Sequence, residues 1–500
     1  MNTFVAVDPD LVSAAAADLR GINAVIDDAN AAAMLKAAGI APAGADEVSV
    51  AITAVFNSHA QSYQEVAAQA SAFNENFALT LTAGGNAYHG TEQVSLQTLW
   101  GAVTFDEQPL MPLLNQSTLW NTGSQTATPS LPSAPPGQTV VLELGGTNYP
   151  VLGGYYPSLI QQLFFPSKLT GSIYTPEQFW PLTPNLGSMS LDQSIAYGVP
   201  LLNTAIFTEI NHGNPVIVWT TSQSSTVATV EIRNLMANGS PDTNMLSFVL
   251  TGDPNNPNGG LLERFNGLYL PGLDVLFNGA TPPNSPYPTQ IWTNQYDGVA
   301  NAPQYPLNGV SDVNAFFGFL FGAHNYTPLW ETQNGVQLPL STTSPAHTVQ
   351  LPTSPGYTGN TTYYFDLEQN LPLVQPLRLF LPQPWGNAFA DLAQPDLRVI
   401  VDMGYGSDEY ANIPTPASLL ELPDPFTIFP DLLVGSIQGP QAFAHDLGAP
   451  VAMPSGYPYN PELNTNLNYP LPQHRITAIS VFTMSEGWVF NQLGLVPQWS

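Results

Sequence analysis

Residues 216–224 read VIVWTTSQS, and this stretch decides the fold we expect for most of the chain. Its apolar and β-branched residues predict a buried strand, and the run from residue 223 to about Met236 predicts a helix directly after it. Ser222 would then stand at a sharp turn from strand to helix, where its hydroxyl is exposed and the helix N-terminus offers N–H groups. A polar start to an ordinary helix explains the same residues equally well, so two interpretations of this serine stay open.

Three other runs also predict buried strands: residues 139–144 (TVVLEL), 245–250 (MLSFVL) and 289–296 (TQIWTNQY). Helical stretches lie between several of them, which indicates an α/β domain with a mainly parallel sheet. The apolar run 313–323 predicts a core helix and is too short to cross a bilayer. Residues 398–406 (RVIVDMGYG) predict a further strand and turn, and the rest of the Pro-rich region after about residue 364 is expected to be a loop-heavy lid or cap.

Two further residues complete a possible hydrolase site. Asp297 follows the strand predicted over residues 289–296, and His324 lies at the exit from the apolar run. Ser222, Asp297 and His324 therefore follow the chain order of an α/β-hydrolase triad. Each also has a plainer interpretation, because an Asp-Gly pair forms turns and a histidine caps helices.

An oxyanion hole needs two backbone N–H groups. The residue after the serine, Gln223, would supply one of them, and Thr147, which follows a glycine pair and the strand 139–144, could supply the other. An ordinary glycine turn is the competing interpretation of residues 145–147.

Composition excludes several classes of function. The 500 residues include 37 Asp and Glu against 8 Lys and Arg, a formal charge of −29, so no basic surface can form for nucleic acid or an anionic membrane. With no cysteine, disulfides, thiolate metal sites and a cysteine nucleophile are excluded. The loop 253–260 lacks the alternating carboxylates of a calcium loop and is interpreted as a structured turn. We expect no metal and no organic cofactor, since His212, His347, His445 and His474 lack metal-ligand spacing. His59 lies on the seam of a predicted helix and is interpreted as a packing residue.

The N-terminal part differs from the rest of the chain in composition and in the period of its apolar residues. Residues 1–99 are Ala-rich, and their apolar positions step by threes and fours in two blocks separated by GIAPAG at 39–44, which predicts an antiparallel pair of long helices. Two helices cannot bury all the phenylalanines of the second block, so we expect a helical partner. Residues 100–137 are rich in Pro, Ser and Thr and are predicted to be a linker. The start of the chain lacks the basic and apolar regions of a secretory signal, so export would need another route.

Together these features resemble a mycobacterial PE-family protein that carries a PE-PPE serine-hydrolase domain. Pro9-Asp10 stands at the Pro-Glu site, and YHGTE at 88–92 fits the type VII secretion signal Y-x-x-x-D/E, with Tyr88 and Glu92 in the two defining positions. The second resemblance runs from about residue 140 to 364 and continues to about 447. It rests on the glycine pair at 145–146, the serine turn, the 252–265 run, YDG at 296–298, His324 with Tyr326, QPDLR at 394–398 and GYG at 404–406.

The resemblance implies a PE helical hairpin over 1–99, a linker over 100–137, a cutinase-like α/β-hydrolase domain over 138–364 and a C-terminal extension over 365–500, a possible lid. It implies that the hairpin pairs with a PPE-family protein, is held by a secretion chaperone, and leaves through type VII secretion for the cell wall or surface. It also implies an acyl-ester or lipid substrate, with Ser222 as nucleophile, His324 as base and Asp297 as its orienting acid.

One residue departs from the family pattern. The family turn reads G-x-S-x-S/G, and Thr220 replaces the first glycine. A β-branched side chain there is expected to crowd the turn, at a cost of roughly 1–3 kcal/mol. Either its neighbours have shrunk to admit it and the chain is an esterase or acyltransferase, or the turn has relaxed. In the second case the fold is a degenerate hydrolase acting as a cell-surface binding or antigenic protein.

Overall fold

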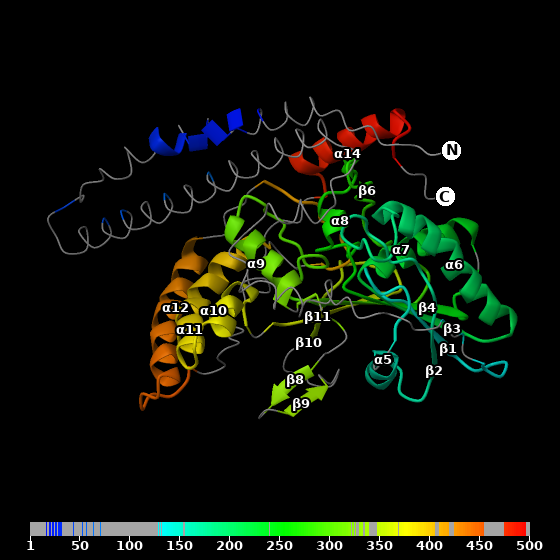
Figure 1. Cartoon of the computed structure of the whole chain (residues 1–500), viewed down its shortest axis with the longest axis horizontal. Helices are drawn as coiled ribbons and strands as arrows, with labels where there is room; N and C mark the ends of the chain where they lie inside the picture. Colours follow the sequence, from blue (N-terminus) through cyan, green and yellow to red (C-terminus); the bar gives the residue numbers. More distant parts are fainter. Residues whose placement is uncertain are drawn as a thin grey trace. The chain divides into compact units, whose positions relative to one another are not determined.

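The computed structural model describes most of the chain from residue 133 onward (Figure 1). The described residues are 133–153, 156–239, 241–321, 323–324, 326, 330–333, 336–339, 348–368, 370–405, 410–419, 425–454 and 475–496, with isolated positions between 17 and 71 and at 129 and 131. The chain divides into two compact units, Met1–Gln108 and Pro109–Ser500.

The larger unit is built on a seven-stranded sheet. Its strands, in spatial order, are β10 (Thr348–Gln350), β11 (Thr361–Asp366), β7 (Thr289–Asn294), β4 (Leu246–Thr251), β3 (Val216–Thr221), β1 (Val140–Glu143) and β2 (Leu169–Ser172). Every neighbouring pair is parallel except β10 and β11. The four predicted strands and the mainly parallel sheet are confirmed. Their side chains are mostly apolar on both faces because helices cover both faces.

One face of the sheet packs against two long helices, α6 (Leu191–Asn211) and α7 (Gln223–Asn238). The sheet contributes Leu142, Val218 and Phe248 to this core, which contains aliphatic side chains from both helices. The opposite face holds an aromatic cluster around Trp219, which packs against α5 (Tyr156–Phe164). With both faces covered, β3 is held rigidly, so the turn that follows it has a fixed position.

The C-terminal part is mainly helical where it is described. It contains α9 (Gly309–Phe321), η1 (Pro372–Val374), α10 (Gln375–Phe380), α11 (Trp385–Asp402), α12 (Pro425–Asp446) and α14 (Ala478–Gln492). The short elements are α8 (Leu261–Arg264) and two antiparallel strand pairs, β5 (Tyr269–Leu270) with β6 (Val275–Leu276) and β8 (Trp330–Gln333) with β9 (Val336–Pro339). The loop-heavy region expected here is therefore largely helical, and its role as a lid stays a prediction.

Of the strand and turn predicted over residues 398–406, the strand is wrong and the turn is present. Residues up to Asp402 form the last turns of α11, and residues 403–405 form a turn. Val399 and Val401 are both fully buried, in different apolar clusters, which a helix packed between neighbours on two sides allows. Tertiary packing thus overrides the β-propensity of this valine-rich run.

The N-terminal unit shows helical residues at most of its described positions. Asn23 donates to Ser71 Oγ at 2.9 Å, and Ser71 donates to Asp27 Oδ2 at 2.7 Å. Two segments far apart in sequence therefore lie side by side, as in a helical hairpin. Tyr88, Glu92 and most of the predicted linker lie outside the described residues. Among the residues described, no helix combines the length and apolar character needed to cross a membrane.

Candidate active site

Ser222 stands at the junction of β3 and α7 in a backbone conformation that few non-glycine residues adopt. Its φ is 56° and its ψ is −123°. Such a conformation costs roughly 1–3 kcal/mol and persists only where the surrounding structure holds it. The Ser222 N–H donates to Thr251 O at 3.0 Å, and the Ser225 N–H donates to Ser222 O at 2.9 Å. The turn is thus anchored to β4 on one side and to the first turn of α7 on the other.

Thr220 is fully buried below this turn. Its Oγ1 is 2.8 Å from Ser225 Oγ, and its carbonyl oxygen accepts a hydrogen bond from Thr251 Oγ1 at 2.8 Å. Ser225 in turn donates to Thr251 O at 3.1 Å. The β-branched side chain therefore faces a small hydroxyl residue, and Thr220 and Thr221 keep regular parallel pairing with β4. Of the two alternatives, this geometry favours the first, in which small neighbouring residues accommodate Thr220 and the turn keeps its shape.

His324 bridges the other two predicted residues. Its Nε2 lies 2.8 Å from Ser222 Oγ, and its Nδ1 lies 2.8 Å and 2.9 Å from the two carboxylate oxygens of Asp297. A carboxylate can only accept a hydrogen bond, so Nδ1 carries the proton and Nε2 is left to accept from the serine hydroxyl. The Asp297 side chain is fully buried, and the His324 side chain is 9% exposed.

Three elements bring these residues together. Ser222 follows β3 and Asp297 follows β7, and the carboxyl ends of parallel strands meet at one edge of the sheet. The loop that carries His324 is tied to the end of β7, because Asn294 Nδ2 donates to Ala323 O at 2.9 Å. Helix α9, just before His324, lies directly on the Asp297 loop: a Cβ on Gly318 would lie 2.0 Å from Tyr296 O.

Tyr326 is a further contact of Asp297. Its hydroxyl donates to Asp297 Oδ2 at 2.7 Å and accepts from the Asn294 N–H at 2.8 Å, while the Val299 N–H donates to Asp297 Oδ1 at 2.8 Å. Burial, and then the charge of Asp297, raises the pKa of Tyr326 well above its ordinary value, so the phenol keeps its proton. Tyr326 belongs to the family pattern around His324, but its spacing from His324 carries no signal of this contact with Asp297.

The two residues predicted for an oxyanion hole lie next to each other. Thr147 Oγ1 donates to Gln223 Oε1 at 2.8 Å, and the side-chain amide of Gln223 donates to Ser194 Oγ at 2.9 Å and to Gln178 O at 3.2 Å. A Cβ on Gly146 would lie 3.0 Å from Ser222 Cβ, so the glycine loop runs against the serine. A side chain at this position would be tightly packed and would push the serine turn by a few tenths of an ångström.

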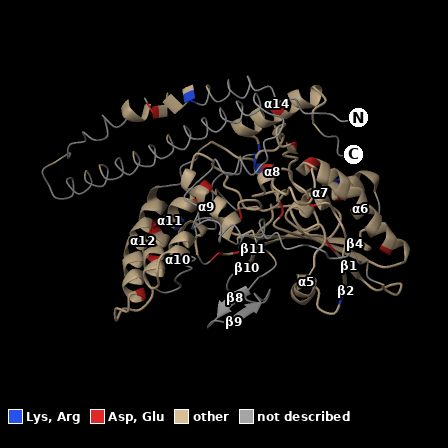
Figure 2. Cartoon of the chain, in the orientation of Figure 1, with Lys and Arg blue, Asp and Glu red and all other residues tan. Residues whose placement is uncertain are grey.

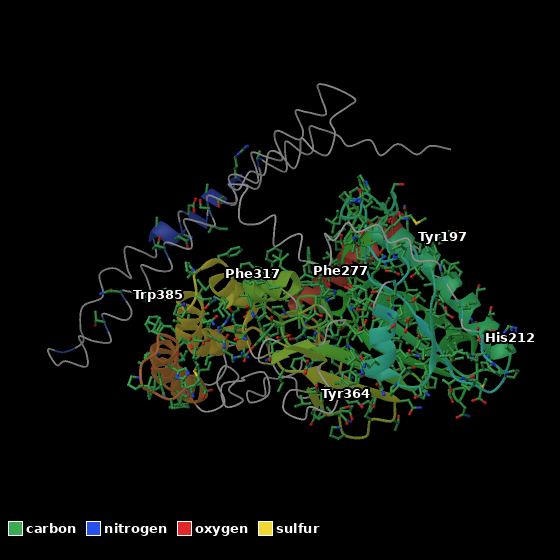
Figure 3. All side chains as sticks on the ribbon, turned by 60° about the horizontal axis from the view of Figure 1, so that its bottom comes forward. Tyr197, His212, Phe277, Phe317, Tyr364 and Trp385 are labelled. Atoms are coloured by element: carbon green, nitrogen blue, oxygen red, sulfur yellow. The ribbon has the colours of Figure 1, made fainter. Side chains whose placement is uncertain are left out.

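The remaining polar candidates are structural where they are described. His212 caps the end of α6 (Figure 3), and His445 in α12 bonds Val451 O through Nδ1 at 2.8 Å. His59, His347 and His474 lie outside the described residues. Within the described part of the chain, no group of three or more His, Asp and Glu side chains could hold a metal ion.

The loop 253–260 is a buried turn. Asp253 accepts from the Asn255 N–H at 2.9 Å and from Thr281 Oγ1 at 2.7 Å. Burial raises the pKa of Asp253 to about 7. Its oxygens are thus engaged in holding the loop, as expected of a structured turn.

Comparison with known proteins agrees with this architecture. Residues 5–95 match the PE family, and residues 166–406 match the PE-PPE domain. The chain is 42% identical over 499 residues to PE family protein PE3 of Mycobacterium tuberculosis, covering 97% of this chain and 98% of that protein. The chain belongs to the PE family. This PE-family protein is also 38% identical over 448 residues to a protein of the same organism named esterase PE16, covering 88% of this chain and 76% of that protein. A PPE family protein, PPE28, shares 38% identity over 321 residues, 62% of this chain and 47% of that protein.

Proposed function

We propose that this PE-family protein is a serine esterase that hydrolyses acyl esters of lipids. The observation that carries the proposal is the unbroken chain of short contacts from Ser222 Oγ through His324 to Asp297. The name of the relative esterase PE16 supports the same class of reaction.

In the proposed reaction, Ser222 Oγ attacks the ester carbonyl carbon while His324 Nε2 takes the hydroxyl proton. Asp297 keeps the imidazole oriented and stabilises its positive charge. His324 then passes the proton to the departing alkoxide, which leaves as the alcohol. A water molecule, deprotonated by His324, attacks the carbonyl carbon of the acyl-serine. The bond from that carbon to Ser222 Oγ breaks, His324 returns the proton to Ser222 Oγ, and the carboxylic acid leaves.

The developing oxyanion would be stabilised by the backbone N–H groups of Gln223 and Thr147. The buried hydrogen bonds of the Gln223 side chain support this assignment, because they limit movement of the peptide that would donate. A lipid or sugar hydroxyl in place of water would give acyl transfer at the same site.

Labelling with a fluorophosphonate probe tests the proposal. The folded wild-type chain should be labelled, and Ser222→Ala should not. The esterase activity of Ser222→Ala should fall by on the order of a thousandfold or more. Ser436→Ala, at an exposed serine of α12, is the matched control and should label normally.

The rival function, a catalytically silent surface protein, rests on Thr220. If the folded wild type, verified by circular dichroism, neither reacts with the probe nor cleaves p-nitrophenyl esters of any chain length, the silent interpretation replaces the esterase.

We also propose that residues 1–99 pair with a PPE-family helical partner and a secretion chaperone and direct export through type VII secretion to the cell wall or surface. The match of residues 5–95 to the PE family supports this. Deletion of residues 1–99, or Tyr88→Ala, should retain the protein inside the cell, whereas His89→Ala, at a free position of the same motif, should not. Unchanged secretion of the deletion variant would contradict the proposal.

A further inference from the structure

Helices α9, α12 and α14 bury mainly small side chains and expose many bulky apolar ones, although Ile428 and Leu432 of α12 and Phe490 of α14 pack inward. In α12, the buried positions include Gly435, Gly439 and Ala442. A Cβ on Gly435 would lie 2.2 Å from Asp396 Oδ1, and one on Gly439 would lie 2.2 Å from Leu392 O, so α12 packs against α11 almost backbone to backbone. The outward stripe of α12 recurs every three or four residues and consists of Phe426, Phe429, Leu433 and Ile437.

Helix α14 repeats the arrangement. Its buried residues are Ser480, Thr483 and Gly487, and a Cβ on Gly487 would lie 1.9 Å from Gly267 O. Its outward side carries Phe482 and Trp488, which are 67% and 64% exposed. In α9, the buried residues are Ser311, Asn314, Ala315 and Gly318, and the exposed residues include Val310, Val313 and Phe316.

These exposed apolar stripes depart from the pattern of a helix on the surface of a water-soluble domain, whose apolar stripe faces the core. Small residues between helices, with bulky apolar residues facing outward, are typical of helices in contact with lipid. No described helix can cross a bilayer, so contact with lipid would be made by lying on its surface. Helix α9 lies between α12 and α14 in both views (Figures 1 and 3).

The charge of these helices indicates which kind of lipid surface they can contact. Their sequences contain no Lys or Arg, and Figure 2 shows the ribbons of α12 and α14 as tan with occasional red. Helices that bind anionic bilayers carry basic residues beside the apolar stripe. A chain of formal charge −29 without such residues would be repelled by an anionic surface.

We infer that α9, α12 and α14 dock this protein on the surface of an uncharged lipid assembly. Helix α9 connects that surface to the candidate site, because the Phe319 ring lies 5.4 Å from the His324 ring and Gly318 packs on the Asp297 loop. The inference goes beyond the proposed hydrolysis and concerns where the enzyme meets aggregated esters.

Vesicle flotation of the full-length Ser222→Ala chain tests the docking without any hydrolysis, so failure of the proposed reaction would not affect the result. The chain should float with phosphatidylcholine vesicles and float less with an equal mixture of phosphatidylcholine and phosphatidylglycerol. Added salt should restore binding to the mixture, because it screens the repulsion.

In that background, Phe429→Gln with Leu433→Gln on α12, and Phe482→Gln with Trp488→Gln on α14, should each weaken partitioning about tenfold or more. Tyr197→Gln is the matched control: Tyr197 is an exposed aromatic residue on α6 (Figure 3), and its replacement should leave partitioning unchanged. Thermal unfolding would verify that each variant is folded.

Absence of flotation by the full chain would overturn the inference, as would α12 and α14 variants that bind like the parent chain. A self-associated form in sedimentation analysis that the same substitutions dissociate would assign the surface to a second copy, and would overturn it as well.

Discussion

At the scale of single residues, Tyr326 contacts the candidate site through its hydrogen bond to Asp297. Tyr326→Phe removes a hydrogen bond to a buried carboxylate and also leaves the Asn294 N–H without that acceptor. A hydrogen bond to a charged group contributes roughly 1.5–3 kcal/mol, so we expect kcat on a soluble p-nitrophenyl ester to fall about tenfold or more while KM changes little.

Tyr364→Phe is the control for this prediction. Tyr364 lies on β11 (Figure 3). Its ring is stacked on Trp292 with a centroid distance of 4.2 Å, so the substitution keeps the stacking and removes only a hydroxyl. If Tyr326→Phe and Tyr364→Phe had the same kcat, a positioning role for Tyr326 would be wrong.

Thr220→Gly separates the two interpretations of the serine turn. The Thr220 side chain is fully buried and its hydroxyl contacts Ser225 Oγ. Glycine would therefore leave a cavity and would remove one hydrogen-bond partner of the Ser225 hydroxyl. We expect the free energy of unfolding to fall by about 1–3 kcal/mol, measured in urea, with no gain in activity. A rise in kcat of tenfold or more would instead mean that the threonine strains the turn.

At the scale of elements, the packing of α9 on the Asp297 loop depends on one glycine. Gly318→Ala would place a methyl group against Tyr296 O, so we expect α9 to shift, stability to fall by roughly 1–3 kcal/mol and esterase activity to drop with it. In the same helix, the methyl group of Gly309→Ala would have no atom within 4 Å. This control should leave stability and esterase activity unchanged or raise stability slightly. Equal effects of the two substitutions in urea unfolding would contradict this account.

Elements differ in how far sequence predicts them. The strands β1, β3, β4 and β7 are continuous apolar runs bounded by turn residues, and this pattern predicted them. The segment 398–402 has the same β-branched composition but ends α11, because its neighbours in space, and not its own residues, determine which faces are buried.

At the scale of the whole molecule, burial of carboxyl groups makes stability depend on pH. Burial raises the pKa of Glu177, Asp192 and Glu368 to about 8 each. The folded chain holds these protons at a pH where the unfolded chain has released them. This contribution to stability is therefore complete below the unfolded pKa values near 4, and is lost as pH rises through about 8.

We therefore expect a higher urea midpoint at pH 5 than at pH 8. Glu177→Gln keeps the shape of a fully buried side chain and removes its titration, so the decline between these values should become shallower, by up to about 1.4 kcal/mol per pH unit. Asp242→Asn, at an exposed turn, is the control and should keep the wild-type slope. A midpoint that rises from pH 5 to pH 8 would contradict the prediction.

Periodicity and turn residues were sufficient to predict an α/β domain and its central strands. These are local properties, since a strand and the turn after it are encoded by neighbouring residues. Chain order made Ser222, Asp297 and His324 candidates only, and the family resemblance was needed to favour them over plainer interpretations. The hydrogen bonds of Tyr326, the accommodation of Thr220 by Ser225 and the outward apolar faces of α12 and α14 were decided only by the tertiary structure. Each depends on which distant segments pack together, and a single sequence does not specify those distances.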